Sequence, residues 1–440
     1  MSSSKPSKQV AVAIVGAGHR ALIYADYARQ RPDRMKVVAV ADPNPARRRE
    51  VAELFNIPPQ HQYLSHKELA EQPQLADAII NGTMDQHHVE TCTPLLEKGY
   101  DILLEKPISN KIEDIYSLLD AVKECKRTLM ICHVLRYSPF YQTIKRLICD
   151  DAIGRILSLH TAEHVSDHHM ATAFVRGRWN KKSDSSPMIL AKCCHDMDII
   201  AWMMDGHSAT RVASFGGRHY FTPENAPAGA ADRCLNGCQV ESSCRYSAQR
   251  IYIDAKLWPF YAWGDAGLIN SSTQQKIESL KTNNPYGRCV WRCDNDVVDH
   301  QSVIIEYANG VAASHDMFCA TTRPARRIHI IGTEGELEGD FEDGIITLRI
   351  PELRTDPQRA EHQYRTQIFD TKITGDSGTS GHGGGDHGLI EDFVSVVSGH
   401  PGSVAVTNLE NSIESHTICF AAEQSRVQGC VVDRNYVISC

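Results

Sequence analysis

The sequence lacks the features of a membrane protein, and it lacks a basic surface. Its 440 residues contain no apolar run near the roughly 18 to 20 residues that a spanning helix requires, so we expect no membrane partner. Residues 1–6 are polar and contain no hydrophobic signal segment, which predicts a cytoplasmic protein. The 46 Lys and Arg are scattered and are outnumbered by 54 Asp and Glu, giving a net charge of −8. We therefore expect no nucleic-acid partner.

The sequence also lacks the paired Cys-x-x-Cys spacing of a zinc ribbon. Its 15 cysteines are an odd number, and without an export signal we expect reduced thiols rather than disulfides. Five of them fall within about 60 residues, enough for a metal site if their two segments meet in the fold. A bound metal, a disulfide and unligated thiols all stay open; we favour unligated thiols and assign no metal ligand. The five are Cys234, Cys238, Cys244, Cys289 and Cys293.

From residue 9 to about 135, short apolar runs rich in Val, Ile and Ala alternate with longer helical patterns. This alternation is typical of βαβ units and predicts a parallel sheet covered by helices. We expect a Rossmann-type N-terminal domain over residues 1–135. The expected strands are Val10–Val15, Lys36–Ala41, Ala78–Asn81, Asp101–Leu104 and Leu129–His133, and the expected helices are Ala21–Gln30, Pro45–Phe55, His87–Lys98 and Glu113–Cys125.

The pattern changes after residue 135, and residues 136–440 are expected to form a second, α+β domain. Strand-like stretches lie close in sequence with turn signals such as Asn309-Gly310 and Glu334-Gly335 between them, which predicts a mostly antiparallel open sheet. The stretch Gly375–Gly388 has the composition of a mobile loop. Two final helices, Leu389–Val397 and Asn408–Val427, are expected to pack back on the first domain. The expected strands are Ile156–Thr161, Arg211–Gly216, Val303–Tyr307 and Arg327–Ile331.

A glycine motif follows the first expected strand. In Gly16-Ala17-Gly18-His19-Arg20-Ala21 the glycines allow a tight turn and close approach of a pyrophosphate, and the small Ala21 lets helix and strand pack closely. The helix that begins there offers free N–H groups to a phosphate. Asp42, at the end of the second strand, suits a ribose 2′-hydroxyl and would repel a 2′-phosphate, so NAD is favoured. NADP stays open because the arginines 47–49 follow.

Lys106 directly follows an apolar strand, within Glu105-Lys106-Pro107. Ligands of open α/β sheets bind at the carboxyl ends of parallel strands, so this lysine lies where a substrate is expected. A lysine there can polarise a substrate hydroxyl. From the residue alone, an ordinary surface lysine is the alternative.

Several motifs together resemble the Gfo/Idh/MocA oxidoreductase family, in order and over nearly the whole chain. The resemblance implies a Rossmann domain, a second domain whose open sheet often forms oligomer contacts, and chemistry on sugars, polyols or related alcohols. It implies a catalytic Lys106 and cofactor contacts from Thr83, His88, Glu105 and Lys106, and we expect a homo-oligomer. The motifs are the glycine turn, Asn81-Gly82-Thr83 with His88, Glu105-Lys106-Pro107, Arg136-Tyr137 with Pro139, His195-Asp196-Met197-Asp198 with Trp202, and His382-Gly383-Gly384-Gly385-Asp386.

The same resemblance implies that His195 meets the substrate, but one position departs from the family pattern. Many members carry an aspartate four residues before this histidine, and here that position is Ala191. His195, Asp198 and Trp202 fall on one helix face, where His195 is placed to remove or return an alcohol proton. Asp198 is either an orienting group or a helix-face carboxylate, and Trp202 is expected to pack in the core.

Two further stretches hold candidate substrate ligands. Arg176-Gly177-Arg178-Trp179 offers hydrogen bonds and a stacking ring beside a histidine-rich stretch, which is either part of a sugar pocket or a loop. Lys192 comes shortly before His195. The predicted substrate ligands are Lys106, Arg176, Trp179, Lys192, His195 and Asp198, and the histidine-rich stretch contains His160, His164, Asp167, His168 and His169.

These features favour an NAD-dependent oxidoreductase that transfers a hydride between nicotinamide and a carbohydrate or polyol carbon, with Lys106 polarising the oxygen and His195 moving the proton. The alternative is an NAD-dependent glycosidase, which oxidises a sugar hydroxyl, eliminates the aglycone, adds water and reduces the ketone again. Residues 176–179 and 192–195 resemble that branch of the family. A non-catalytic dinucleotide sensor is a third interpretation, and the presence of Lys106 and His195 argues against it.

Overall fold

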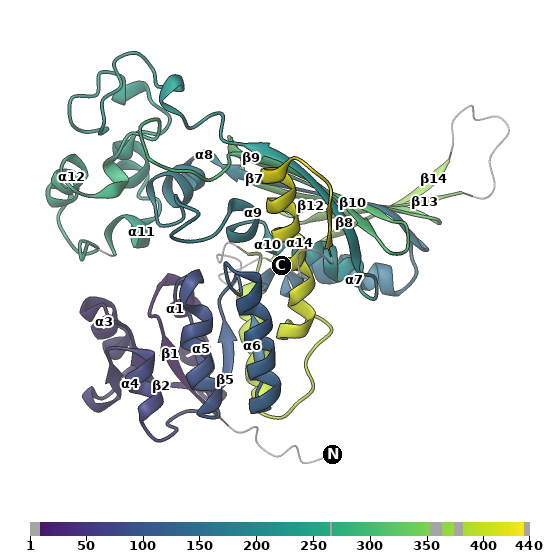
Figure 1. Cartoon of the computed structure of the whole chain (residues 1–440), viewed down its shortest axis with the longest axis horizontal. Coiled ribbons are helices and arrows are strands. Elements are labelled where there is room, and N and C mark those ends of the chain that lie inside the picture. Colours follow the sequence, from purple (N-terminus) through teal and green to yellow (C-terminus); the bar gives the residue numbers. More distant parts are fainter. Residues whose placement is uncertain (1–8, 265, 353–362, 374–381, 435–440) are drawn as a thin grey trace.

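The computed structural model describes residues 9–264, 266–352, 363–373 and 382–434, which form two β-sheets with helices packed on them (Figure 1). The first sheet has six strands, and all of its strand pairs are parallel. The second has nine strands, and one of its pairs is parallel while the others are antiparallel. The predicted fold class is confirmed.

The first sheet is built from the apolar runs of residues 9–135. Its central strands are buried on both faces, which requires apolar side chains in both directions and explains the runs. In sheet order the strands are β3 (Gln62–Tyr63), β2 (Met35–Ala41), β1 (Val10–Val15), β4 (Ala78–Asn81), β5 (Asp101–Leu104) and β6 (Leu129–Ile131). The helices are α1 (His19–Ala25), α2 (Tyr27–Gln30), α3 (Pro45–Phe55), α4 (His66–Glu71), α5 (His88–Glu97) and α6 (Ile112–Cys125).

The second sheet has one covered and one open face. Along its central strands inward residues are buried and outward residues are exposed, the pattern of a half-buried sheet. The predicted turn at Asn309-Gly310 is found, with Gly310 at a φ of 84°. In sheet order the strands are β14 (Tyr364–Asp370), β13 (Ile345–Pro351), β12 (Glu336–Asp340), β11 (Ala325–Gly332), β7 (Ile156–Ser166), β10 (Ala312–Thr321), β9 (His300–Tyr307), β8 (Ala209–Gly217) and β15 (Val432–Asp433).

Helices cover the inner face of the second sheet, and an insertion extends from its edge. Residues 218–299, between β8 and β9, form a lobe of short helices that lies at the upper left of Figure 1, above α1 and α3. None of the helices in the described ranges is long and apolar enough to cross a membrane. The helices are α7 (Pro139–Cys149), α8 (Asp167–His169), α9 (Met188–Ala191), α10 (Cys194–Met203), α11 (Pro259–Trp263), α12 (Thr273–Lys281), α13 (Gly385–Val397) and α14 (Leu409–Gln428).

The glycine-rich stretch Gly375–Gly388 differs from the predicted loop at its end. Residues 374–381 lie outside the described residues, but α13 begins at Gly385, four residues before the predicted helix start. A Cβ at Gly385 would lie 2.1 Å from the carbonyl oxygen of Val134, so glycine is needed here for close packing of the helix on the first domain. The loop prediction was wrong for Gly385–Gly388 because composition alone does not separate packing glycines from flexible ones.

The last helix, α14, joins the two domains. It contacts β8 and α10 of the second domain and β6 and α6 of the first. Just before it, the Thr407 carbonyl accepts from the Ile131 N–H of β6 at 2.8 Å, and the Thr407 hydroxyl donates to the Ile131 carbonyl at 2.6 Å. Within α14, the buried His416 donates from Nδ1 to the Ser412 carbonyl and accepts from the Ile108 N–H at Nε2, 3.0 Å away.

Burial lowers the pKa of His416 from its ordinary value of 6.5 to about 3. The unfolded chain therefore gains a proton as pH falls through about 6.5, which the folded chain does not accept, and folding stability is lost on the acid side. For His416 this amounts to about 2 kcal/mol between about pH 7.5 and about pH 5. Urea unfolding at several pH values should show a shallower acid loss in His416→Gln than in the unchanged protein. The exposed His207→Gln is the control, and an equal slope in all three proteins would contradict the assignment.

Candidate active site

Two tight turns meet at the carboxyl ends of β1 and β4. Gly16 has a φ of 77°, and a Cβ there would lie 2.6 Å from the backbone nitrogen of Thr83. A Cβ at Gly82 would in turn lie 2.8 Å from the Cβ of Ala21. The glycines are therefore required for the close approach of the two turns. Next to them, His19 has a buried Nδ1 with no hydrogen-bond partner among the described residues. These are features of a backbone cradle, and they fit the predicted dinucleotide.

Asp42 lies at the end of β2 and faces the same turn. One carboxylate oxygen accepts from the Ala17 N–H at 2.7 Å, and the other accepts from the Asn44 N–H at 2.7 Å. Each oxygen keeps a free lone pair, so the carboxylate can still accept ribose hydroxyls. Arg48 donates to the backbone carbonyl of Asp42 at 2.5 Å, so one of the arginines that follow Asp42 is held on its main-chain oxygen.

Thr83 and His88 hold the β4 turn in place. The Thr83 hydroxyl donates to the Asn81 side-chain carbonyl at 2.7 Å. The fully buried His88 ring lies between two backbone carbonyls, with Nδ1 at 2.7 Å from that of Pro107 and Nε2 at 3.1 Å from that of Thr83. His88 thus connects the β4 turn to the segment that follows Lys106.

Arg20, whose side chain is 25% exposed, forms an ion network with two buried carboxylates and links three elements. Its Nε donates to Glu105, at the end of β5, at 3.0 Å, and its Nη2 donates to Asp386 of α13 at 2.5 Å. The Tyr24 hydroxyl also donates to Glu105 at 2.7 Å, and His382 lies 3.1 Å from the other oxygen of Asp386. Burial alone would raise the pKa of both carboxyls, but the positive charge of Arg20 holds each below its ordinary value.

Lys106 lies where the two domains meet. Its ammonium group extends from the end of β5 and donates to the backbone carbonyl of Ala191 at 2.7 Å. Ala191 is the position at which the sequence departs from the family pattern, so a main-chain oxygen stands there in place of a carboxylate. Glu105 accepts from the backbone N–H of Lys106 at 2.9 Å, which joins this lysine to the Arg20 network.

His195 belongs to a row of four histidines beside Lys106, of which His133, His195 and His416 are buried and His382 is partly exposed. The ring centroids are 5.6 Å apart for His382 and His195, 6.0 Å for His195 and His133, and 5.4 Å for His133 and His416. Burial, followed by the positive charge of Lys106, lowers the pKa of His195 well below its ordinary value. Its Nδ1 is buried and has no hydrogen-bond partner among the described residues. The imidazole is therefore neutral at neutral pH and able to accept a proton.

Asp198 has a partner that the sequence did not indicate. Both of its oxygens accept from the buried Arg136, at 2.7 and 2.6 Å, in a bidentate ion pair. Trp202 is 4% exposed, as predicted for a core residue, and the Arg136 guanidinium lies 5.6 Å from its ring centroid. Asp198 therefore anchors α10 to Arg136, and we propose no substrate contact for it.

Lys192 also has a structural partner. Its ammonium pairs with Glu163 of β7 at 3.0 Å, and Glu163 pairs with Arg326 of β11 at 2.5 Å. Arg326 continues to Asp196 at 3.2 Å. This buried network of two cations and two anions attaches the segment before His195 to the second sheet.

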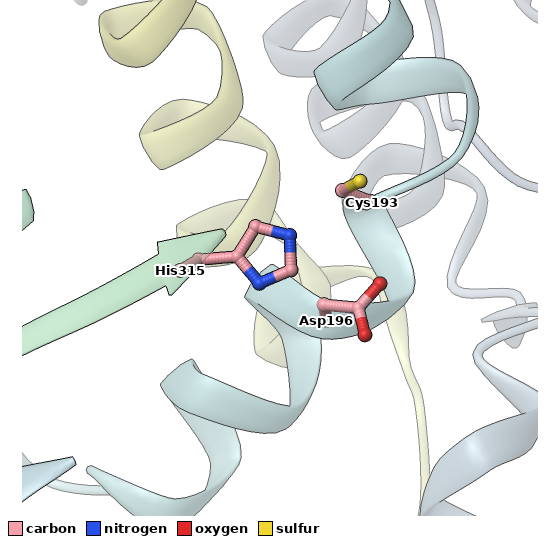
Figure 2. Close-up of side chains that lie close together, drawn as sticks. All are labelled: Cys193, Asp196 and His315. Atoms are coloured by element: carbon pink, nitrogen blue, oxygen red, sulfur yellow. The ribbon is translucent and has the colours of Figure 1, made fainter. Parts of the chain in front are cut away.

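Figure 2 shows Asp196 with Cys193 and His315, whose possible ligand atoms lie within 4.8 Å of one another. His315 of β10 bonds Thr161 through Nδ1 at 2.9 Å, and burial lowers its pKa. The guanidinium of Arg326 already neutralises Asp196, and its positive charge would oppose a metal cation at this position. We therefore regard the group as part of the ion network.

Aromatic rings connect the insertion lobe to the glycine turn that would hold the cofactor, called here the cofactor turn. The sequence did not single out these rings. Phe260 of α11 lies over His19, with ring centroids 4.9 Å apart. The ring centroids of Tyr261 and Trp179 are 6.0 Å apart, and those of Trp258 and His169 are 4.7 Å apart. Trp179 and His169 therefore belong to an aromatic wall near the turn. The rings of the lobe lie in no short motif from which the sequence could have predicted this role.

The other residues near this stretch lie elsewhere. The buried Arg176 donates to the backbone carbonyls of Arg288 and Tyr246, at 2.7 and 2.8 Å, inside the lobe. His160 bonds Ser314 on the outer side of the second sheet. The histidine-rich stretch is therefore divided between the sheet surface and the aromatic wall, and it does not form one polar cluster.

Comparison with known proteins places both domains. Residues 10–133 match the oxidoreductase family with an NAD-binding Rossmann fold (GFO_IDH_MocA), and residues 145–429 match its C-terminal alpha/beta domain. YteT of Bacillus subtilis, named as an oxidoreductase, is 26% identical over 330 residues, which are 72% of this chain and 72% of YteT. Inositol 2-dehydrogenase of Corynebacterium glutamicum is 24% identical over 240 residues, 54% of this chain and 65% of the relative.

The solved structures show the same fold. Levoglucosan dehydrogenase in complex with NADH superimposes with a TM-score of 0.67 at 17% identity, covering 97% of this chain and 99% of that one. The two family matches span most of the sequence, and the glycine turn, Asp42 and Lys106 lie at the expected ends of the parallel strands. The chain belongs to the Gfo/Idh/MocA family of NAD-binding oxidoreductases.

Proposed function

We propose that this enzyme oxidises a secondary hydroxyl of a sugar or cyclic polyol with NAD. The observation that carries the proposal is the position of Lys106, which extends from the strand end beside the cofactor turn to the second domain, next to a neutral His195. Relatives named for inositol and levoglucosan oxidation support a substrate of this class. A cytoplasmic location stays a prediction from the sequence.

The proposed cofactor contacts follow from the turn geometry. Residues 16–20 would hold the pyrophosphate and Asp42 the ribose, while Thr83, His88 and Glu105 keep the neighbouring turns in register. NAD, when bound, supplies the hydride acceptor.

The proposed chemistry on the substrate uses two side chains. Lys106 donates a hydrogen bond to the substrate hydroxyl oxygen and stabilises negative charge that develops there. As the C–H electron pair leaves with its hydrogen as hydride, a C=O bond forms and the hydroxyl proton passes to the neutral His195. Trp179, in the aromatic wall, is the remaining predicted ligand that we propose touches substrate, through its ring face.

The glycosidase alternative loses two of its supports in the structure. It rested partly on Arg176 and Lys192, and these side chains are held by the lobe carbonyls and by Glu163. We therefore favour the dehydrogenase, and the assay described below distinguishes the dehydrogenase from the glycosidase. A glycosidase returns its hydride in each turnover and forms no net NADH.

The functional test is a panel of sugars, cyclic polyols and aryl glycosides assayed with NAD and with NADP. We expect NADH to form in step with oxidised product, and a weaker reaction with NADP because the Asp42 carboxylate would repel its 2′-phosphate. Release of aglycone without added NAD and without net NADH would contradict the dehydrogenase assignment.

The role of Lys106 is tested by Lys106→Ala. Loss of the donor to the substrate oxygen should lower kcat by at least about a hundredfold while leaving NADH affinity nearly unchanged. Lys111→Ala, an exposed lysine on the same segment, is the matched control. Turnover and fluorescence titration of NADH together check this, and unimpaired turnover in Lys106→Ala would make the residue structural.

We further propose that the chain forms a homo-oligomer through the open face of the second sheet. Large apolar side chains are exposed there on adjacent strands, including Phe215 at 74% and Ile304 at 57%. Phe215→Lys with Ile304→Lys should reduce the assembly to a smaller species in sedimentation velocity. Leu64→Lys, on an exposed residue of the first domain, should leave the size unchanged. A monomeric unchanged protein would refute the interface.

A further inference from the structure

The insertion lobe brings together cysteines that are far apart in sequence. Cys234, Cys238, Cys244 and Cys289 line one small pocket, together with Arg176. The two segments that carry them are held by backbone hydrogen bonds, from Cys234 N–H to Gly287 at 2.9 Å and from Cys289 N–H to Asp232 at 2.8 Å. The two cysteine-bearing segments therefore lie together in the fold. The sequence analysis gave this as the requirement for a metal site, and these four thiols fulfil it.

Arg176 gives an independent indication that negative charge belongs in the pocket. It is 1% exposed, its Nη1 has no hydrogen-bond partner, and none of the ion pairs found among the described residues includes it. Glu241 also lines the pocket, and its carboxylate accepts a hydrogen bond from the Ser247 hydroxyl. Its Nη2 lies 3.3 Å from the sulfur of Cys234. A buried guanidinium without an anion is costly, and neutral thiols do not compensate it. Thiolates bound to a metal would compensate the charge of this guanidinium.

We propose that Cys234, Cys238, Cys244 and Cys289 bind a metal centre through their thiolates. Binding releases the thiol protons to solvent and leaves a site with net negative charge beside Arg176. The fifth cysteine of the group, Cys293, is not among the residues that line the pocket.

The sulfur spacing distinguishes between two kinds of centre. A single tetrahedral zinc with bonds of about 2.3 Å holds its sulfurs about 3.8 Å apart. Among the described residues, three ligand atoms lie within 4.8 Å of one another in the group that contains Cys193. No three sulfurs of the present group are that close together. The wider spacing favours a cluster of several irons and sulfides over one zinc ion, and iron and sulfide are then the co-reactants required for assembly.

A metal centre here would also affect the proposed active site. The lobe consists of short helices and connecting segments, and it carries Phe260 and Tyr261 to His19 and Trp179. Cross-linking four points of such a lobe restricts it in the way that metal sites stabilise small domains. Loss of the metal should therefore loosen residues 218–299 before the two sheets unfold.

The test is purification of the full chain without oxygen and without a metal-affinity step, followed by metal analysis, acid-labile sulfide assay and visible absorption. We expect iron together with acid-labile sulfide in a stoichiometric amount, whereas zinc without sulfide would contradict the cluster inferred from the sulfur spacing. Metal-free protein with four reactive thiols, or a disulfide within this group, would overturn the proposal.

Variants link the metal to this pocket. Cys238→Ser and Cys244→Ser change partly exposed residues and should lose the bound metal, whereas the exposed Cys430→Ser should retain it. Limited proteolysis gives a second readout, because the metal-free variants should be cut faster within 218–299. NADH binding shows whether the remainder is folded. Full metal content in both pocket variants would overturn the assignment, whatever the outcome of the activity assays.

Discussion

The active site depends on one cation, Arg20, whose two carboxylate partners are buried. Its guanidinium binds Glu105 and Asp386 at once; Glu105 directly follows β5 of the first domain, and Asp386 belongs to α13 of the second. The glycine turn, the strand that precedes Lys106 and the helix that follows His382 are thereby fixed to one group. Removing the arginine would leave two buried carboxylates without a counter-charge, which is far more costly than losing a surface ion pair. The domains can therefore be regarded as one unit around the site.

The charges in the site also explain the protonation state of the histidines. Lys106 supplies positive charge beside a row of four imidazoles, three of them buried, and burial with that charge keeps His195 neutral. A base that is already protonated could not accept the hydroxyl proton, so the neutral imidazole is the form that an alcohol oxidation requires. In this chain the carbonyl of Ala191 holds the lysine, and an aspartate is not needed for that purpose.

The first domain could be predicted almost element by element, because each strand of a buried parallel sheet must be apolar on both faces and its glycine turn has strict steric demands. The second sheet was predicted only in part. Strands such as β12 and β14 carry charged or exposed residues that hide the alternation. The partners of Arg136, Arg176 and Lys192 could not be foreseen, since Asp198, Arg288 and Glu163 are distant in sequence and local periodicity contains no information about long-range ion pairs.

The insertion lobe contains both the thiol pocket and the aromatic rings that reach the active site. Residues 218–299 contain few regular elements, and a segment of this kind gains little from its own core. Yet it must place Phe260 and Tyr261 against His19 and Trp179 within van der Waals reach for the aromatic wall to exist. Such precision requires a restraint inside the lobe. The buried Arg176, bonded to the carbonyls of two separate segments and facing four thiols, is where that restraint would act.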